Sequence, residues 1–138
     1  MKANEINPTR VNTVRTILYW TFGLLPILAG LDKFFHVLTN WDKYILAFQD
    51  VIPFAPHTFM MIVGIIEIIA GIIVFIIPRV GAFIVAAWLA CIAIVLVAGM
   101  NYYDIAVRDI VMALSVFCLG ELSLRQKKIT RETPVVTP

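Results

Sequence analysis

Four long apolar segments alternate with short polar connections along the chain. The apolar segments cover residues 14–34, 58–77, 80–98 and 104–124. Each is close to the roughly 20 residues that an α-helix needs to cross the hydrocarbon core of a bilayer. The connections after the second and third segments are short, so consecutive helices should be antiparallel neighbours. The pattern predicts an all-α fold: an integral membrane four-helix bundle that occupies residues 1–128 as one domain.

The longest connection, residues 38–57, carries a pattern of its own. Its apolar side chains recur at helical spacing over residues 41–52, and polar side chains fill the other face. Asn40 stands where an N-cap is expected, and Pro53 ends the pattern. We therefore expect a short amphipathic helix that lies in the membrane interface, because the segment is too short to span. Its aromatic face either anchors it in lipid or forms a lid or partner-docking surface made of Trp41, Tyr44 and Phe48.

Composition supports a membrane protein. Hydrophobic residues make up 61% of the chain and charged residues 14%, whereas a soluble domain carries about a quarter charged residues. A soluble enzyme is excluded, because uncovered apolar helices aggregate in water. The net charge of +2 and the lack of a basic patch exclude nucleic-acid binding. Cys91 and Cys118 match no redox or zinc spacing and are expected to pack as small hydrophobic residues.

The distribution of basic residues predicts how the bundle is oriented. Most of the 11 lysine and arginine residues fall at the two termini and between the second and third segments. Basic residues stay on the cytoplasmic side, so both termini should be cytoplasmic and the connection 38–57 should face outward. The first apolar segment is too long for a signal peptide and contains Pro26, so it should be a retained helix. Residues 129–138 are polar and proline-bearing, which predicts a disordered cytoplasmic tail.

One ionisable residue lies near the middle of a predicted membrane span. Glu67 is flanked on its helical face by Gly64 and Gly71, and small residues let another helix approach closely. Glu67 should therefore face another helix rather than lipid. A lone carboxylate at this depth is costly, so Glu67 should be paired or protonated.

Further polar residues cluster at the outward ends of the first and fourth segments. Together with Glu67 they form the predicted ligand-binding or polar-cavity set. Its other members are Asp32, Lys33, His36, Asn101, Asp104, Arg108 and Asp109. Carboxyl groups outnumber the lysine and arginine of this set by two, so either His36 or a carboxyl group should be protonated, and Glu67 is the most desolvated carboxyl group. The set either binds a polar group or moves a proton, or it is an ion-pair network that fixes helix register.

The sequence predicts no catalytic residues. It contains no glycine-rich phosphate loop and no Ser–His–Asp arrangement, so we do not expect the chain to be catalytic on its own. A metal ion held by Asp32, His36 and Asp109 is conceivable. However, a lone histidine among carboxylates is more often a hydrogen-bond partner, so no metal site is predicted.

Three short motifs point to a family. Residues 28–34 end the first segment with a glycine and then a polar–Lys–hydrophobic step. Residues 63–71 contain Gly-x-x-Glu-x-x-x-Gly, and residues 104–122 open with Asp-x-x-x-Arg-Asp. With these motifs the chain resembles the DoxX-like family of small four-helix bacterial membrane proteins. The resemblance implies that Lys33 and Glu67 are a polar pair, and that Arg15 corresponds to the arginine that begins the family's first helix.

The resemblance also implies a function. Some DoxX-like proteins are membrane subunits of thiosulfate:quinone oxidoreductases, and others are associated with redox or thiol-stress systems. We therefore expect an accessory subunit of a quinone-linked redox system in the bacterial cytoplasmic (inner) membrane, with a partner subunit. We expect no covalently bound cofactor, and quinone is the cofactor that such a role would bring into contact with the protein. Two alternatives stay open: a small-molecule binder or proton-coupled carrier that uses Glu67, and a structural or assembly protein.

Overall fold

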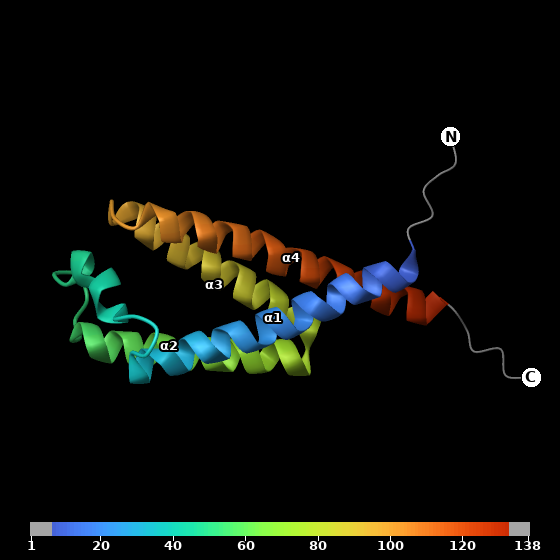
Figure 1. The fold of residues 1–138 in the computed structure, drawn as a ribbon, viewed down its shortest axis with the longest axis horizontal. Coiled ribbons are helices and arrows are strands. Elements are labelled where there is room, and N and C mark those ends of the chain that lie inside the picture. Colours follow the sequence, from blue (N-terminus) through green and yellow to red (C-terminus); the bar gives the residue numbers. More distant parts are fainter. Residues whose placement is uncertain (1–6, 133–138) are drawn as a thin grey trace, which may run out of the picture.

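The computed structural model describes residues 7–132, and this part of the chain is all-helical, as predicted. It contains four long α-helices, and two 3₁₀ helices lie between the first and the second (Figure 1). In chain order the elements are α1 (Pro8–Phe35), η1 (Trp41–Tyr44), η2 (Leu46–Phe48), α2 (Pro56–Ile76), α3 (Pro78–Ala98) and α4 (Tyr103–Glu132).

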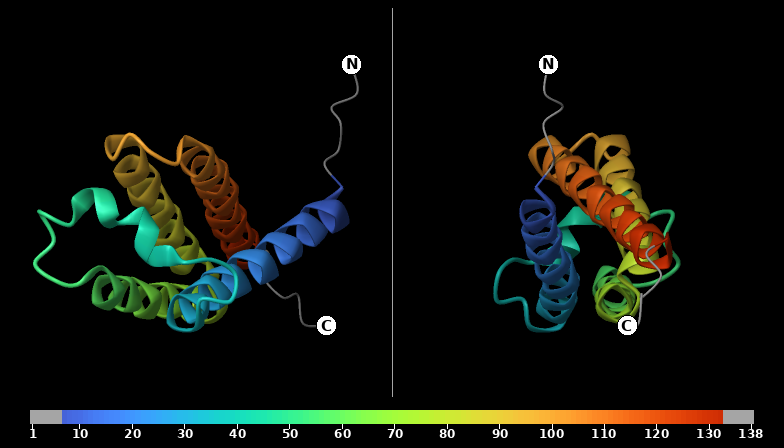
Figure 2. Two further views of the ribbon diagram at one scale, coloured as in Figure 1. Left: turned by 60° about the vertical axis from the view of Figure 1, so that its left-hand side comes forward. Right: turned by 90° about the vertical axis from the view of Figure 1, so that its right-hand side faces the viewer.

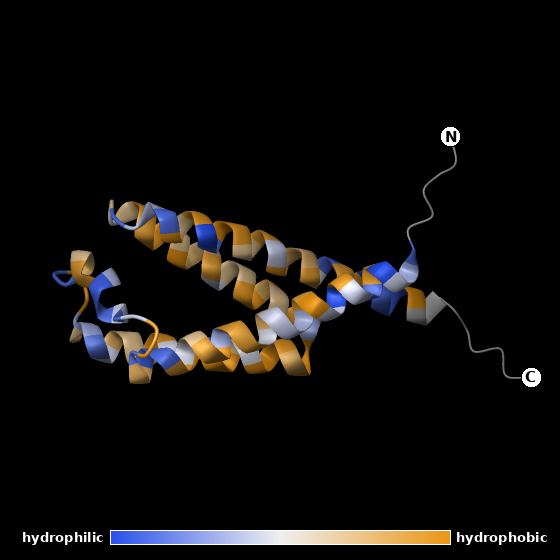
Figure 3. Ribbon diagram, viewed as in Figure 1, coloured by the Kyte–Doolittle hydropathy of each residue, from blue (hydrophilic) through white to orange (hydrophobic). Residues whose placement is uncertain are grey.

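Three of the helices, α1, α2 and α3, are long and apolar enough to cross a membrane. A helix of 21 residues, such as α2 or α3, is about 31 Å long and matches the thickness of the hydrocarbon core. Many large apolar residues of these helices are exposed, and the ribbon is coloured as hydrophobic along much of their length (Figure 3). Among them are Trp20, Leu28, Ile65, Ile69, Ile84 and Ile94. The helix α4 covers the fourth predicted span but carries more charged residues, so its crossing of the membrane stays a prediction.

The four helices pack as two antiparallel pairs, α1 with α2 and α3 with α4. The two pairs meet near the end of the bundle where α1 begins and α4 ends, and they diverge toward the other end (Figures 1 and 2). We call these the terminal end and the loop end. The connection between α1 and α2 lies at the loop end, where it reaches from one pair toward the other.

Glycines bring α1 and α2 close together. A Cβ atom on Gly30 would lie 2.5 Å from the carbonyl oxygen of Gly64, and one on Gly64 would lie 2.7 Å from that of Gly30. Gly71 meets the backbone of Gly23 in the same way. The close helix approach predicted at Gly64 and Gly71 is therefore confirmed. It also brings Lys33 against α2, because the Cβ of Lys33 is 3.2 Å from the Cβ position of Gly64.

The apolar core and the buried charges occupy different parts of the bundle. The main apolar cluster is contributed by all four helices and includes Phe22, Val74, Val85, Val116 and Leu119. The buried charged side chains of the described residues are Asp32, Lys33, Glu67 and Asp109. Asp32, Lys33 and Asp109 belong to the loop-end halves of α1 and α4, and Glu67 lies at the middle of α2. The fold thus encloses a polar layer between an apolar core and the α1–α2 connection.

The helix ends differ from the predicted boundaries. The helix α1 begins at Pro8, six residues before the predicted span, because Asn7 Oδ1 accepts a 3.0 Å hydrogen bond from Thr9 N and proline is favoured in a first helical turn. The helix α4 continues to Glu132, so the prediction of a disordered tail is wrong for residues 129–132. The rest of that predicted tail, residues 133–138, lies outside the described residues.

The α1–α2 connection is helical where a helix was predicted, but it forms two 3₁₀ helices rather than one continuous helix. The Asn40 cap is confirmed, since Asn40 Oδ1 accepts a 3.1 Å hydrogen bond from Asp42 N. Isolated short helices are marginal, so tertiary contacts decide the local conformation. Here Ile45 is buried and Trp41 reaches the bundle, so the backbone follows these two contacts.

Candidate functional site

The centre of the site is an ion pair between the first two helices. Lys33 Nζ donates a 2.6 Å hydrogen bond to Glu67 Oε2, and the two side chains are only 4% and 9% exposed. The pair exists because the Gly30–Gly64 contact lets the lysine reach along α2 toward the glutamate. The polar pair implied by the sequence motifs is therefore present. Glu67 was expected to be either paired or protonated, and the structure gives its carboxylate a cationic partner, Lys33.

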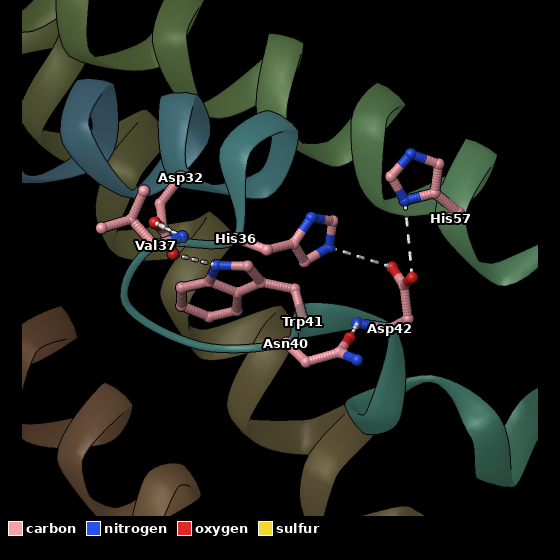
Figure 4. Close-up of polar contacts among 7 residues, drawn as sticks. All are labelled: Asp32, His36, Val37, Asn40, Trp41, Asp42 and His57. Carbon is pink, nitrogen blue, oxygen red and sulfur yellow. Dashed lines mark hydrogen bonds and ion pairs between the residues drawn. The ribbon is translucent and has the colours of Figure 1, made fainter.

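Trp41 lies over this ion pair. Lys33 Nζ is 3.9 Å from the centroid of the Trp41 ring, which is cation–π distance. Trp41 Nε1 donates a 2.6 Å hydrogen bond to Asp32 Oδ2 (Figure 4). The residue predicted to belong to a lid or docking surface thus packs onto the buried charges of the bundle.

Asp32 has a different environment from the other buried acids. Its Oδ1 accepts hydrogen bonds from the backbone N–H groups of Val37, at 2.9 Å, and Leu38, at 2.8 Å. With the bond from Trp41, three donors compensate the carboxylate. These donors follow the last residue of α1, so Asp32 fixes the direction in which the chain leaves the helix.

Asp109 adds a third carboxylate from the second helix pair. It is 6% exposed, and it is close enough to Glu67 and Lys33 to interact with both electrostatically. Its ion-pair contact within residues 7–132 is a long one, because Arg108 Nε is 4.0 Å from Asp109 Oδ1. The Arg108 side chain is 61% exposed, so it compensates the buried carboxylate weakly.

Trp88 completes the polar layer from α3. Its Nε1 atom is buried and forms no hydrogen bond with any described residue. The side chain is nevertheless near enough to Glu67 to act on its carboxylate. We call Lys33, Glu67 and Asp109, with Trp41 and Trp88 around them, the polar cluster. Each of the four helices contributes one side chain to it, and the connection supplies Trp41.

The charges of this layer do not balance. The buried charged residues of the described chain are three carboxylates and one ammonium group. Lys33 neutralises Glu67, and hydrogen bonds compensate Asp32, so the uncompensated group is Asp109. The sequence analysis placed the excess proton on His36 or on a carboxyl group, and it named Glu67 as the most desolvated carboxyl group. The contacts favour Asp109 instead.

Three of the predicted site residues are exposed and lie outside the polar cluster. Asp104 and Arg108 are exposed, and the close contact of Arg108 is with Asp109 rather than with Asp104. Asn101 is exposed and donates a 2.8 Å hydrogen bond to the carbonyl oxygen of Gly99, which stabilises the turn before α4. The sequence analysis grouped these residues with the others because all of them lie near the outward ends of the predicted spans. In the structure these three residues are exposed and are not part of the buried layer.

An open cavity of about 330 Å³ lies between the connection and the ends of α3 and α4. Two of the predicted lid residues, Tyr44 and Phe48, line it together with Asn101 and Tyr102. The rings of Tyr44 and Tyr102 pack edge to face with centroids 4.7 Å apart. The connection therefore contacts both helix pairs at the loop end.

A second polar group at the loop end was not predicted. His36 follows α1, Asp42 belongs to η1, and His57 lies in the first turn of α2. The three side chains converge (Figure 4). His36 Nε2 is 3.7 Å from Asp42 Oδ1, His57 Nδ1 is 3.4 Å from Asp42 Oδ2, and the imidazole rings stack at 5.3 Å. The sequence contained one indication of this group. Its two histidines flank the connection between two antiparallel helices, so both lie at the same end of the bundle.

The metal set that the sequence suggested, Asp32, His36 and Asp109, does not come together. Asp32 is engaged with Trp41 and the backbone, and Asp109 belongs to the polar cluster. The two cysteines also differ from expectation. Cys91 and Cys118 are exposed on the outer surfaces of α3 and α4, where a membrane would surround them.

Comparison of the chain with protein-family models, with curated proteins and with solved structures finds no match. The resemblance to the DoxX-like family therefore rests on the sequence motifs alone and stays a prediction. The function has to be argued from the geometry of the described residues.

Proposed function

We propose that this protein is a membrane carrier or receptor that binds a small cationic solute, in exchange for a proton, at the polar cluster. One observation carries the proposal: Asp109 is buried beside an ion pair that is already balanced. This is the stand-alone binding hypothesis of the sequence analysis, with Asp109 joining Glu67 as a binding group.

The chemistry follows from the cost of buried charge. An ionised carboxylate inside a membrane protein needs a partner, and such residues usually mark the path of a substrate or a proton. Among the described residues, Asp109 is near two cations: Arg108, which is too exposed to serve as a close partner, and Lys33, which is already paired with Glu67. A proton or the cationic group of a solute would neutralise Asp109, and the two would compete for the same oxygen atoms.

The ion pair gives the site a second acceptor. Lys33 is held by Glu67 on one side and by the ring of Trp41 on the other. If a solute draws the Glu67 carboxylate toward itself, Lys33 keeps a favourable contact with the indole ring. Trp41 also covers the pair, so displacement of the connection would open the site from the loop end.

Infrared difference spectroscopy on the purified protein in lipid nanodiscs tests the proposal. We expect the wild-type protein to show the carbonyl band of a protonated carboxyl group, and we expect a small amine to reduce it. Asp109→Asn should remove the amine-sensitive band. The matched control is Asp104→Asn, because Asp104 is exposed on the same helix, and this variant should behave as the wild type.

Two results would contradict the proposal. One is a wild-type protein without a protonated carboxyl band across the pH range in which it stays folded. The other is an amine response that survives in Asp109→Asn. Loss of the folded protein is monitored separately by circular dichroism, and Asp109→Glu, which keeps the carboxyl group, should retain the band.

The other two hypotheses rest on the sequence and stay predictions. For an accessory subunit of a quinone-linked redox system, the test is extraction of quinone and recovery of a partner subunit after mild purification from the native membrane. For an assembly protein, the test is loss of association when Trp41 and Phe48 are replaced by alanine.

A further inference from the structure

We infer that His36, Asp42 and His57 form a binding site for a divalent transition-metal ion of the Zn²⁺ class. Each residue offers one ligand atom, and these atoms all lie within 4.8 Å of one another. The site is separate from the polar cluster, and the inference does not depend on the proposed function.

The distances fit a shared ion better than direct hydrogen bonds. The two nitrogen–oxygen separations are 3.7 Å and 3.4 Å, whereas an N–H···O hydrogen bond is about 2.7–3.2 Å long. In a tetrahedral zinc site with bonds of about 2.0–2.1 Å, neighbouring ligand atoms are about 3.3–3.4 Å apart. The two separations involve different oxygens of Asp42, and the three ligand atoms, one from each residue, lie within 4.8 Å of one another. The side chains therefore need to move by roughly an ångström to coordinate one ion.

Two of the ligand atoms also lack any other partner. His36 Nε2 and Asp42 Oδ1 are buried and form no hydrogen bond within the described residues. Buried polar side-chain atoms are nearly always paired, so an orphan of this kind calls for an explanation. A metal ion between them would satisfy both atoms at once.

The donor atoms select the kind of ion. Two imidazole nitrogens and one carboxylate oxygen are typical ligands of Zn²⁺ and its neighbours among the transition metals. Ca²⁺ needs about six or more oxygen ligands, and Mg²⁺ an octahedral set of oxygens, so neither suits this group. Three protein ligands would leave a fourth position for water.

The chain places each ligand by a local contact. His36 ends α1 in the left-handed conformation, with φ 52° and ψ 38°, a position that glycine usually occupies. The Asn40 side chain holds the amide of Asp42 at the start of η1. His57 follows Pro56, the first residue of α2. A bound ion would therefore join the connection to the adjacent ends of α1 and α2 and hold it over the polar cluster.

Metal titration of the full chain tests this inference. The protein in nanodiscs is stripped with a chelator and titrated with Co²⁺, whose visible absorption reports tetrahedral coordination, and Zn²⁺ is then added as a competitor. We expect one ion per chain and displacement of Co²⁺ by Zn²⁺. His57→Asn and Asp42→Asn should each weaken Zn²⁺ binding by more than about tenfold.

Matched variants separate this site from others. Asp50→Asn lies on the same connection but outside the group, and it should bind Zn²⁺ as the wild type does. Asp109→Asn, the variant that tests the polar cluster, should also leave Zn²⁺ binding unchanged. His57 is half-exposed, so its replacement should not unfold the protein, and circular dichroism checks this.

A second measurement follows the connection itself. Trypsin can cleave after Lys43, which is exposed next to Asp42. Zn²⁺ should slow this cleavage in the wild type and have no effect in His57→Asn. The inference is overturned if the wild type binds no stoichiometric ion, or if His57→Asn and Asp42→Asn bind Zn²⁺ as tightly as the wild type.

Discussion

Three carboxylates are buried at the loop end, and each is compensated in a different way. Asp32 is held by backbone amides and an indole N–H, and Glu67 by an ammonium group. Asp109 has a long contact with an exposed guanidinium group and a weaker interaction with the lysine that Glu67 already holds. Residues of similar chemistry therefore have different roles. Asp32 shapes the chain and Glu67 joins two helices, whereas under the proposed function Asp109 takes up a proton or a ligand.

The ion pair makes a prediction at the scale of single residues. Lys33→Met leaves Glu67 buried without a partner, which should lower the free energy of unfolding by about 3–5 kcal/mol. Lys33→Met combined with Glu67→Gln removes both charges and should recover much of that loss. Denaturant titration in detergent measures the difference. Lys43→Met, at an exposed position, should change stability by less than about 0.5 kcal/mol. A double variant as unstable as Lys33→Met alone would show that the charge of Glu67 is not the cause.

At the scale of single residues, the sequence identified most of the buried charged residues but not the residues that each of them contacts. Glu67 and Lys33 could be found because a charged residue stands out in an apolar helix and glycines mark the helix contact. The environment of Asp109 could not be found, since it depends on how the two helix pairs meet. Asp42 and His57 were missed because their contact depends on the path of an irregular connection, which residue periodicity does not describe.

The elements are held together by two kinds of contact. Both occur within the first pair. Glycine backbones touch directly along part of it, and near the end of α2 a side chain bridges the two helices, because Tyr19 donates a 3.0 Å hydrogen bond to the carbonyl oxygen of Phe75. Direct backbone contact lowers the tolerance for any added atom. The register of α1 against α2, and with it the ion pair, depends on these glycines.

Gly30→Ala tests this dependence. The added methyl group would lie 2.5 Å from the carbonyl oxygen of Gly64, which is backbone and cannot rotate away. We expect a loss of about 1–3 kcal/mol in the free energy of unfolding, together with a weaker Lys33–Glu67 contact. Gly99→Ala is the control, because its methyl group would meet the mobile ring of Phe48 at 3.1 Å. Equal stability of the two variants would refute the proposed role of the α1–α2 contact.

Sequence periodicity was informative for whole elements and weak at their ends. The four helices were found because long apolar segments have few alternatives in a membrane. The extension of α1 to Pro8 depends on a cap, and that of α4 to Glu132 on a polar segment with good helix formers such as Arg125, Lys127 and Lys128. The 3₁₀ helices of the connection differ from the predicted single helix because Trp41 and Ile45 are anchored to the bundle.

At the scale of the whole molecule, the start of α1 and the end of α4 lie at the same end of the bundle (Figure 1). Three helices are apolar enough to cross a membrane, and α4 returns along α3 for the length of that helix. The outer face of α4 is also apolar and exposed, with Val107 at 61%, Val111 at 56% and Leu114 at 63%. These features support a fourth crossing and an even number of spans.

Labelling with a membrane-impermeant maleimide tests the topology. In a variant that lacks Cys91 and Cys118, a cysteine at Lys43 should react in intact cells. A cysteine added after Pro138, or before Met1, should react only after permeabilisation, because the positive-inside rule places both termini in the cytoplasm. Opposite locations for the two termini would show that α4 does not cross the membrane.

A single residue, Ile77, separates α2 from α3. Its N–H donates a 2.8 Å hydrogen bond to Ile73 in α2, and its carbonyl oxygen accepts a 2.9 Å bond from Gly81 in α3. One inserted or deleted residue would rotate the following helix by about 100° about its axis, which would turn buried side chains toward lipid. The number of residues at this junction is thus as tightly constrained as the identity of a core side chain. Natural variation in length should be confined to the segment between α1 and α2.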